Sequence, residues 1–338
     1  MLTSDEERIL QSIKVHSSND PNNPEFPFDE PKFPATPTHS IKVPGFENTW
    51  LKDESHNPTG THKDRMAWEM VVTYRDFLIS KKIGNIKKLP QMSIITSGSA
   101  GYAIQTALRK FNLPNLKCLI DSQLELKIKE SLEKIGCELF ETDLGKKAFN
   151  WMDILSLTNN KDGVDVTSSE ALDPTSRYYD WLSYEIVNQN PEYCFIPFGT
   201  GNLYENILNI VKKEVAAFDS SDPRFKGDIH KLRRCNFIGV TTNNPKTKAT
   251  KLYSPHLPFV HFGEQWIRFY RQAAYCGRES NVHILKEKYL DLAINLAEEI
   301  KINAEPSALA GLGMLLQMKN HIPKKAKILI VSTGKTKY

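Results

Sequence analysis

The chain has few of the features that mark a secreted, membrane or metal-binding protein. Its five cysteines are scattered, odd in number and form no C-x-x-C pair, which favours reduced thiols over a disulfide framework or a zinc site. No apolar run is long enough to span a membrane. The first residues, MLTSDEERIL, are acidic and lack the apolar core of a signal peptide. We therefore expect a cytoplasmic protein that binds neither a metal nor a membrane.

Charge of one sign is also scarce. The net charge is +4 and no lysine- or arginine-rich block stands out, so the sequence predicts no nucleic-acid partner. Residues 266–278 do interleave Arg268, Arg271 and Arg278 with aromatic residues, but we interpret them as a packed helix with arginines over aromatic faces. His256 and His261 match no metal-ligand spacing.

The chain has 338 residues, 40% of them hydrophobic and 25% charged, which is enough for two globular domains. The apolar pattern predicts strands at residues 91–96, 116–121, 137–141, 192–198, 236–240 and 326–332. It predicts helices at residues 100–111, 123–135, 203–214 and 305–318. Such βαβ alternation indicates an α/β fold of two domains, each with a largely parallel sheet flanked by helices. Six prolines in residues 21–37 indicate an extended surface arm.

The stretch NPTGTHKDR, residues 57–65, places a lysine where a helix is expected to begin. Thr61 and Asp64 have the spacing of a capping box, and the apolar residues that follow recur at helical spacing, so a helix is predicted from Thr61. Lys63 would then lie in the first turn, at the positive end of the helix dipole. This position favours a neutral, nucleophilic amine, although most lysines in a first turn are exposed surface residues.

Two glycine-containing stretches lie where a predicted strand passes into a helix. GTGN, residues 199–202, would offer backbone N–H groups to a phosphate, and its alternative is an ordinary left-handed turn. TSGSAG, residues 96–101, would hold a substrate carboxylate through hydroxyl and N–H groups, and its alternative is a hydroxyl-rich helix cap.

VSTGKT, residues 331–336, contains the Gly-Lys-Thr of a nucleotide-binding P-loop. That motif needs a glycine five residues before Gly334, and Leu329 stands there, so we reject nucleotide hydrolysis. What remains is a pair of hydroxyls, Ser332 and Thr333, at the carboxyl end of a predicted strand. Open α/β sheets bind their ligands at such strand ends.

In their order along the chain, these stretches resemble the tryptophan synthase β-subunit-like superfamily of pyridoxal 5'-phosphate enzymes. This group, known as fold type II, includes relatives of cysteine synthase, threonine synthase and threonine dehydratase. The resemblance covers roughly residues 34–336. It is carried by ATPT (35–38), LKDESHNPTGTHKDR (51–65), TSGSAG (96–101), FGTGN (198–202), EPSALAGLG (305–313) and STG (332–334).

The resemblance implies a role for each stretch. Lys63 would be the catalytic residue and hold pyridoxal 5'-phosphate as an internal aldimine, with His62 and Ser99 beside the cofactor. Thr333, or as second choice Ser332, would meet the pyridine nitrogen. The residues expected to bind the cofactor phosphate are Gly199, Thr200, Gly201, Asn202 and Leu203. The residues expected to face the substrate are Thr96, Ser97, Gly98, Ser99, Ala100 and Arg177.

The resemblance also implies domain boundaries and an assembly. Residues 1–61 would form an arm and strand of the large domain, residues 62–168 the small domain, and residues 169–338 the rest of the large domain. The cofactor would lie in the cleft between the domains, and family precedent suggests a homodimer.

The sequence departs from the family pattern in several places. Ser99 stands where members often have an asparagine that reaches the ring hydroxyl of the cofactor, and Thr200 and Asn202 stand where many have glycine. DPTSRYYDWLSYEI, residues 173–186, is faintly similar to a stretch of threonine synthase, but it lacks the glycine–glutamine–lysine–threonine run of that branch. No branch of the superfamily fits cleanly.

A hydroxyl at the ring nitrogen, rather than a carboxylate, makes the cofactor a shallower electron sink and disfavours transamination. We therefore expect β-elimination or β-replacement on a serine-like or threonine-like amino acid through an aminoacrylate. One alternative is a γ-replacement of the threonine synthase kind on a phosphorylated homoserine, for which Arg177 would offer a charge. The other alternative is a homologue that binds the cofactor without catalysis, which is suggested by Ser99 in place of the usual asparagine.

Overall fold

The computed structural model describes residues 1–17, 33–167, 178–216, 225, 227–253, 274–275, 278–279 and 281–338. The chain divides into two compact units. Unit 1 comprises Met1–Pro34, Lys63–Tyr178 and Tyr338, and unit 2 comprises Ala35–His62 and Tyr179–Lys337. Five residues discussed above lie outside the described part of the chain, namely Arg177, His256, His261, Arg268 and Arg271. So does most of the proline-rich segment, and of Arg278 only the backbone is described.

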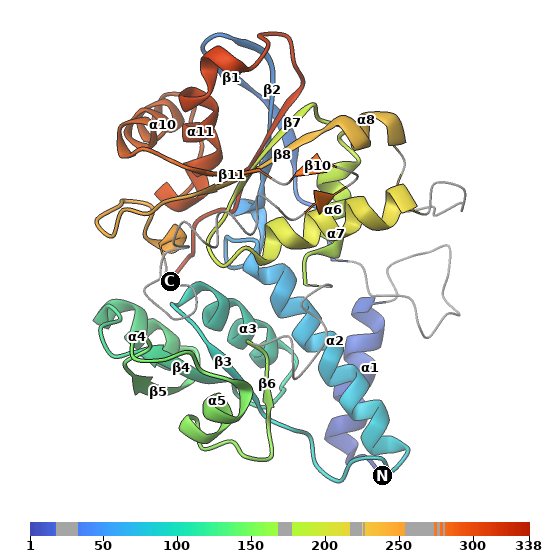
Figure 1. Cartoon of the computed structure of the whole chain (residues 1–338). Coiled ribbons are helices and arrows are strands. Elements are labelled where there is room, and N and C mark those ends of the chain that lie inside the picture. Colours follow the sequence, from blue (N-terminus) through green and yellow to red (C-terminus); the bar gives the residue numbers. More distant parts are fainter. Residues whose placement is uncertain are drawn as a thin grey trace. The chain divides into compact units, whose positions relative to one another are not determined.

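Unit 1 contains a four-stranded sheet in which all neighbouring strands are parallel, in the order β5-β4-β3-β6 (Figure 1). The strands are β3 (Met92–Ile95), β4 (Lys117–Asp121), β5 (Glu138–Thr142) and β6 (Val164–Asp165). Ile94, Leu119 and Ile120 in the two middle strands are buried, as expected for a parallel sheet covered on both faces. The helices are α1 (Ser4–Ser17), α2 (Lys63–Lys82), α3 (Ser99–Lys110), α4 (Leu126–Lys134) and α5 (Trp151–Leu157).

Unit 2 contains a six-stranded sheet in the order β1-β2-β12-β7-β8-β11. β1 (Thr38–Val43) and β2 (Phe46–Asp53) form an antiparallel hairpin. The remaining strands, all parallel to their neighbours, are β7 (Tyr193–Pro197), β8 (Asn236–Thr241), β11 (Asn281–Ile284) and β12 (Ile328–Ser332). A separate short ribbon pairs β9 (Ala274–Tyr275) with β10 (Arg278–Glu279).

Helices cover both faces of the unit 2 sheet, with α10 and α11 on one face and α6 and α7 on the other (Figure 1). The α-helices are α6 (Asp180–Val187), α7 (Asn202–Ala216), α8 (Ile229–Arg234), α10 (Glu287–Glu299) and α11 (Ala310–Gln317). Short 3-10 turns are η1 (Glu54–His56), η2 (Thr250–Leu252), η4 (Pro306–Leu309) and η5 (Lys319–His321). Gly311 lets α11 lie close on the sheet, because a Cβ there would stand 3.1 Å from Ile330 Cγ2 and from the Phe195 carbonyl oxygen.

The predicted α/β fold is confirmed, and the strands and helices predicted from the apolar pattern are present within a few residues. The packed helix predicted at residues 266–278 is wrong in its described part, because Ala274–Tyr275 and Arg278–Glu279 pair as the antiparallel strands β9 and β10. The helix predicted at residues 305–318 differs at its start, because Pro306 opens the 3-10 turn η4 and the α-helix α11 begins only at Ala310. The pattern missed α1, β1, α5, β6, α6, α8, β11 and α10. β1 alternates weakly, with exposed or partly exposed residues over most of its length, so its apolar signal is small.

The N-terminal residues differ from the predicted domain division, because Met1–Pro34 belongs to unit 1 and not to the unit that contains residues 35–62. The physical reason is the packing of α1 against α2. Leu10 and Ile13 of α1 are buried, and Glu6 forms a 2.6 Å ion pair with Lys81 near the end of α2. None of the described helices is long and apolar enough to cross a membrane.

We expect Ile13→Ala to lower the free energy of unfolding by about 2–4 kcal/mol, because it leaves a cavity under a fully buried helix face. Urea denaturation followed by circular dichroism measures the change. Gln11→Ala, at an exposed position of the same helix, is the matched control. Equal stability of the two variants would contradict the packing of α1 on unit 1.

Candidate active site

Lys63 is the first residue of α2 and directly follows residues 57–62, which we call the lysine loop. The helix begins two residues after Thr61, where the sequence predicted its start. The reason is that Thr61 forms an antiparallel bridge with Gly334, which takes its backbone out of the helix. Lys63 nevertheless lies in the first turn of the helix, as predicted, where backbone N–H groups have no acceptor within the helix.

The amine of Lys63 is held in a partly buried environment. Burial lowers the pKa of the Lys63 amine from 10.5 to about 8, because desolvation disfavours the charged ammonium form. At pH 8, roughly half of the Lys63 side chains would then carry a neutral amine, which is the nucleophilic form. The chemistry inferred from helix position is thus supported by a second, independent physical cause.

Backbone hydrogen bonds tie the lysine loop to residues 333–337 within unit 2. The donor–acceptor pairs are His62 N–H to Thr333 O (3.1 Å), Lys335 N–H to Gly60 O (2.8 Å) and Lys337 N–H to Thr59 O (3.0 Å). This pairing fixes the backbone of His62, the residue that directly precedes Lys63 in the chain.

Two glycines make this backbone pairing possible. Gly60 and Gly334 have φ angles of +86° and +89°, in the left-handed region. A Cβ on Gly334 would stand 2.1 Å from the carbonyl oxygen of Gly60, so there is no space for a side chain at this position. The positive φ angle is a second reason, because residues other than glycine rarely adopt it. The sequence motifs PTG and STG each contain one of these glycines, but the sequence did not predict that the two glycines contact one another.

The predicted phosphate loop, residues 199–201, joins the end of β7 to the start of α7. Gly201 has a φ of +87°, and a Cβ on Gly199 would stand 2.6 Å from the carbonyl oxygen of Lys251. The N–H groups of Asn202 and Leu203 lie in the first turn of α7, at the positive end of its dipole. Free N–H groups at a helix N-terminus suit an anionic group such as a phosphate.

Ser332 lies at the same sheet edge as this loop. β12 pairs in parallel with β7, with Ile330 opposite Phe195, so the carboxyl ends of both strands meet at one edge. Ser332 is fully buried, and its Oγ has no hydrogen-bond partner in the described part of the chain. An unpartnered buried hydroxyl is costly, so it suits a polar atom of a ligand. Thr333 follows directly and is 8% exposed.

In unit 1, the predicted substrate loop, residues 96–101, joins β3 to α3. The hydroxyl of Thr96 accepts hydrogen bonds from the N–H groups of Gly98 (3.1 Å) and Gly101 (3.2 Å), so Thr96 shapes the loop from within. Gly98 has a φ of +124°, which disfavours any side chain. Ser99 is the first residue of α3 and is buried, Ser97 is exposed, and Ala100 is partly exposed.

Within each unit, the structure therefore brings some of the predicted site residues together. Unit 2 brings the phosphate loop and Ser332 to one sheet edge and ties His62 to Thr333. The His62 ring also lies 5.3 Å from the Tyr179 ring, centroid to centroid. In unit 1, Lys63 and Ser99 each begin a helix, and those two helices pack against one another.

The chain belongs to the pyridoxal-phosphate dependent enzyme family, whose model matches residues 32–334. No curated protein matches the sequence. Solved structures of similar fold include O-ureido-L-serine synthase, at 17% identity, a TM-score of 0.63 and 89% coverage of both chains. Another is the O-acetylserine dependent cystathionine β-synthase from Helicobacter pylori, at 17% identity and a TM-score of 0.61, covering 89% of this chain and 92% of that one.

A third similar structure is a mutant hydrogen sulfide-producing enzyme from Fusobacterium nucleatum, complexed with an α-aminoacrylate intermediate. It has 17% identity and a TM-score of 0.61, and the match covers 86% of this chain and 81% of that one. At this level of identity the solved structures show the fold, and the family match defines the class. The protein is a pyridoxal 5'-phosphate-dependent enzyme.

The residues present fit this cofactor. The loop between β7 and α7 leads into the N-terminus of α7, whose free backbone N–H groups suit a phosphate, and Ser332 offers a buried hydroxyl oxygen without a hydrogen-bond partner among the described residues. Lys63 offers an amine of lowered pKa. These are three different observations on three separate parts of the chain.

We expect the Lys63 amine of the apoprotein to react with an amine-labelling reagent along a titration curve centred near pH 8. Because the pKa is lowered, reactivity rises through pH 8, whereas a solvent-exposed lysine gains reactivity only near about pH 10.4. Competitive labelling with mass spectrometry measures each lysine in the same sample, so the exposed lysines serve as the internal control. A curve for Lys63 centred near 10 would contradict its burial.

We expect Gly201→Asp to lose cofactor affinity, because it sets a carboxylate against the phosphate directly before the first turn of α7. Gly201→Asn is the matched control, since asparagine has the same shape and tolerates a positive φ but carries no charge. Cofactor content after dialysis, measured by absorbance, compares the two. If both variants retain full cofactor, the phosphate lies elsewhere.

Proposed function

We propose that this enzyme catalyses β-elimination or β-replacement on a serine-like or threonine-like amino acid, with Lys63 as the residue that attaches the cofactor. The observation that carries the reaction type is the buried Oγ of Ser332 at the end of β12, which has no hydrogen-bond partner among the residues that the structure describes. It offers a hydroxyl, not a carboxylate, to the ring nitrogen. Thr333 is the neighbouring candidate for this role.

The acidic residue opposite Ser332 in the sheet does not change that conclusion. Asp53 pairs with Ser332 across β2 and β12. Its carboxylate accepts a 2.9 Å hydrogen bond from the Ser55 N–H at the start of η1, and lies 3.3 Å from His56 Nδ1. Asp53 is therefore engaged as a helix cap, which leaves a hydroxyl as the group at the strand end.

The partner of the ring nitrogen influences the reaction type. When bound, the cofactor withdraws electrons from the α-carbon of an amino acid. A carboxylate would keep the ring nitrogen protonated and make this withdrawal strong, whereas a hydroxyl donates to an unprotonated nitrogen and leaves it weaker. Loss of a leaving group from Cβ as the α-proton departs then becomes favoured over transamination.

The protein's own residues would divide the remaining work. The backbone N–H groups of residues 199–203 would bind the phosphate, and His62 would lie beside the cofactor. The Lys63 amine, with its lowered pKa, would attach the cofactor and later accept the α-proton of the substrate. Thr96, Ser97, Gly98, Ser99 and Ala100 would hold the substrate carboxylate through hydroxyl and N–H groups.

The similar structures support a serine-derived substrate, since two of them are named for O-ureido-L-serine and O-acetylserine. The reduced state inferred for the cysteines supports a cytoplasmic location, and the family resemblance supports a homodimer. Sedimentation velocity on the holoenzyme tests the assembly.

The function is tested in two steps. Borohydride reduction and peptide mapping should find the cofactor on Lys63, and a Lys63→Ala variant should carry no label. The holoenzyme is then given serine, threonine, O-acetylserine, O-phosphoserine and O-phosphohomoserine. We expect keto acid or a replaced amino acid from at least one serine-like or threonine-like substrate.

Two outcomes would overturn the proposed reaction. Turnover of O-phosphohomoserine alone would point to γ-replacement. A labelled Lys63 with no turnover of any substrate would point to a protein that binds the cofactor without catalysis. Conversion of the cofactor to its pyridoxamine form would contradict the argument from the Ser332 hydroxyl.

A further inference from the structure

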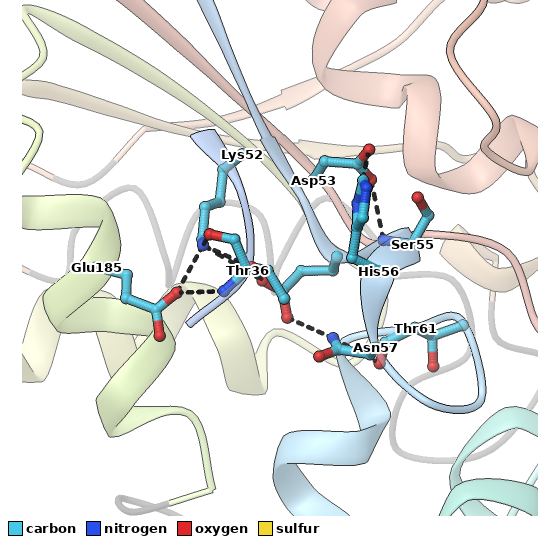
Figure 2. A network of polar contacts seen from close by, with 9 residues as sticks. Thr36, Lys52, Asp53, Ser55, His56, Asn57, Thr61 and Glu185 are labelled. Carbon is cyan, nitrogen blue, oxygen red and sulfur yellow. Dashed lines mark hydrogen bonds and ion pairs between the residues drawn. The ribbon is translucent and has the colours of Figure 1, made fainter. Parts of the chain in front are cut away.

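A buried charged network lies directly before the lysine loop (Figure 2). It is formed around Lys52 at the end of β2 and Glu54 at the start of η1, which are 1% and 0% exposed. Glu185 of α6 supplies a second carboxylate, with 18% of its side chain exposed. Two carboxylates and one ammonium therefore meet inside unit 2.

The ammonium of Lys52 uses all three of its donors within this network. It donates to Glu185 Oε2 (2.5 Å), to the Thr36 carbonyl oxygen (2.6 Å) and to Thr36 Oγ1 (2.5 Å). Glu54 Oε1 lies 3.8 Å from the same nitrogen and accepts a hydrogen bond from the Thr36 hydroxyl. Lys52 thus balances the Glu54 charge directly and, through Thr36, fixes the orientation of its carboxylate.

The other oxygen of Glu54 is directed toward the lysine loop. Asn57 Nδ2 donates to Glu54 Oε2 (2.8 Å) and also to the carbonyl oxygen of Thr61 (3.0 Å) (Figure 2). The side-chain amide of Asn57 has two N–H donors, and both are used. Asn57 therefore links the buried carboxylate to a backbone carbonyl only two residues before Lys63.

Tyr179 lies near the other end of the lysine loop. Burial, together with the negative charge of Glu54, raises the pKa of the Tyr179 phenol. The Tyr179 ring lies 5.3 Å from that of His62, the residue next to Lys63. The link from Glu54 to the lysine loop that hydrogen bonds show is the one through Asn57 to Thr61.

Burying ionised groups costs desolvation free energy, and apolar side chains of similar size are often at least as stabilising in a protein interior. Here one carboxylate of the network, that of Glu54, accepts a hydrogen bond from the lysine loop, and that loop directly precedes the residue that would attach the cofactor. We propose that Glu54 is a positioning residue for Lys63, acting through Asn57 on the carbonyl of Thr61. This inference rests on the proposed role of Lys63.

The proposal predicts that loss of the link affects covalent attachment of the cofactor to Lys63 but not its non-covalent binding. Without the Glu54–Asn57–Thr61 link, the phosphate loop is unchanged, but the Lys63 amine is no longer held in one place. Misplacement of a reacting group by about 1 Å can slow a reaction on the order of a hundredfold. Covalent attachment should therefore slow while non-covalent binding of the cofactor's phosphate and ring persists.

The test uses apoprotein and measures two quantities for each variant. One is the rate at which pyridoxal 5'-phosphate becomes attached to Lys63, by borohydride quenching and peptide mapping. The other is the affinity for 4'-deoxypyridoxine phosphate, an analogue without the aldehyde that cannot bond to an amine. Glu54→Gln removes the charge, and Asn57→Leu removes the link while leaving every charged group in place.

We expect both variants to attach the cofactor between about ten- and a hundredfold more slowly, with analogue affinity within about twofold of the natural protein. The double variant should be no slower than the slower single variant, since both changes break one chain of contacts. Glu214→Gln is the matched control. Glu214 is another buried carboxylate of unit 2, and it accepts a hydrogen bond from the Tyr184 hydroxyl, on α6.

The outcomes separate this proposal from the proposed function. If the natural protein attaches no cofactor to Lys63, the assignment of Lys63 is wrong. If it does, and Asn57→Leu is as fast as Glu214→Gln, the positioning role alone is wrong. A parallel loss of analogue affinity would also overturn it, because the network would then support the whole site. If Glu54→Gln does not fold, Asn57→Leu carries the test.

Discussion

The backbone pairing of the lysine loop with residues 333–337 is the constraint on which the proposed site depends. It brings two distant parts of the sequence together through main-chain hydrogen bonds, and it requires glycine at positions 60 and 334. The pairing ends the extended backbone at His62, so that α2 begins at Lys63. It also extends β12 beyond Ser332, whose hydroxyl lies at the same sheet edge as the phosphate loop.

Burial then gives the charged groups near this pairing their properties. For Lys63, loss of water lowers the pKa of the amine to about 8 and makes the nucleophilic form available near neutral pH. For Lys52 and Glu54, burial makes an ion pair and a chain of hydrogen bonds necessary, because neither charge can be left alone. The same physical effect therefore produces a reactive amine in one place and a rigid support in another.

Much of the fold could be predicted from local pattern. Segments such as LKCLID and AKILIVS are short apolar runs that become buried parallel strands, and the glycines of GTGN lie between a strand and a helix as expected. The start of α2 could not be predicted in the same way. Thr61 and Asp64 have capping-box spacing, but Thr61 pairs with Gly334, and no local rule anticipates a partner so far along the chain. The sequence also assigned α1 to the wrong unit, for the same reason. Its place in unit 1 depends on the packing of Leu10 and Ile13 there.

The sequence by itself determined the α/β class, the position of Lys63 in a first helical turn and the order of the glycine- and hydroxyl-rich stretches. These properties follow from apolar periodicity and from residue types at short spacing. Only the tertiary structure decided that Ser332 presents a buried hydroxyl with no hydrogen-bond partner in the described part of the chain, and that Lys52 pairs with Glu54, which accepts a hydrogen bond from Asn57. Burial and hydrogen-bond partnership depend on which distant segments pack together, and a local pattern contains no record of that choice.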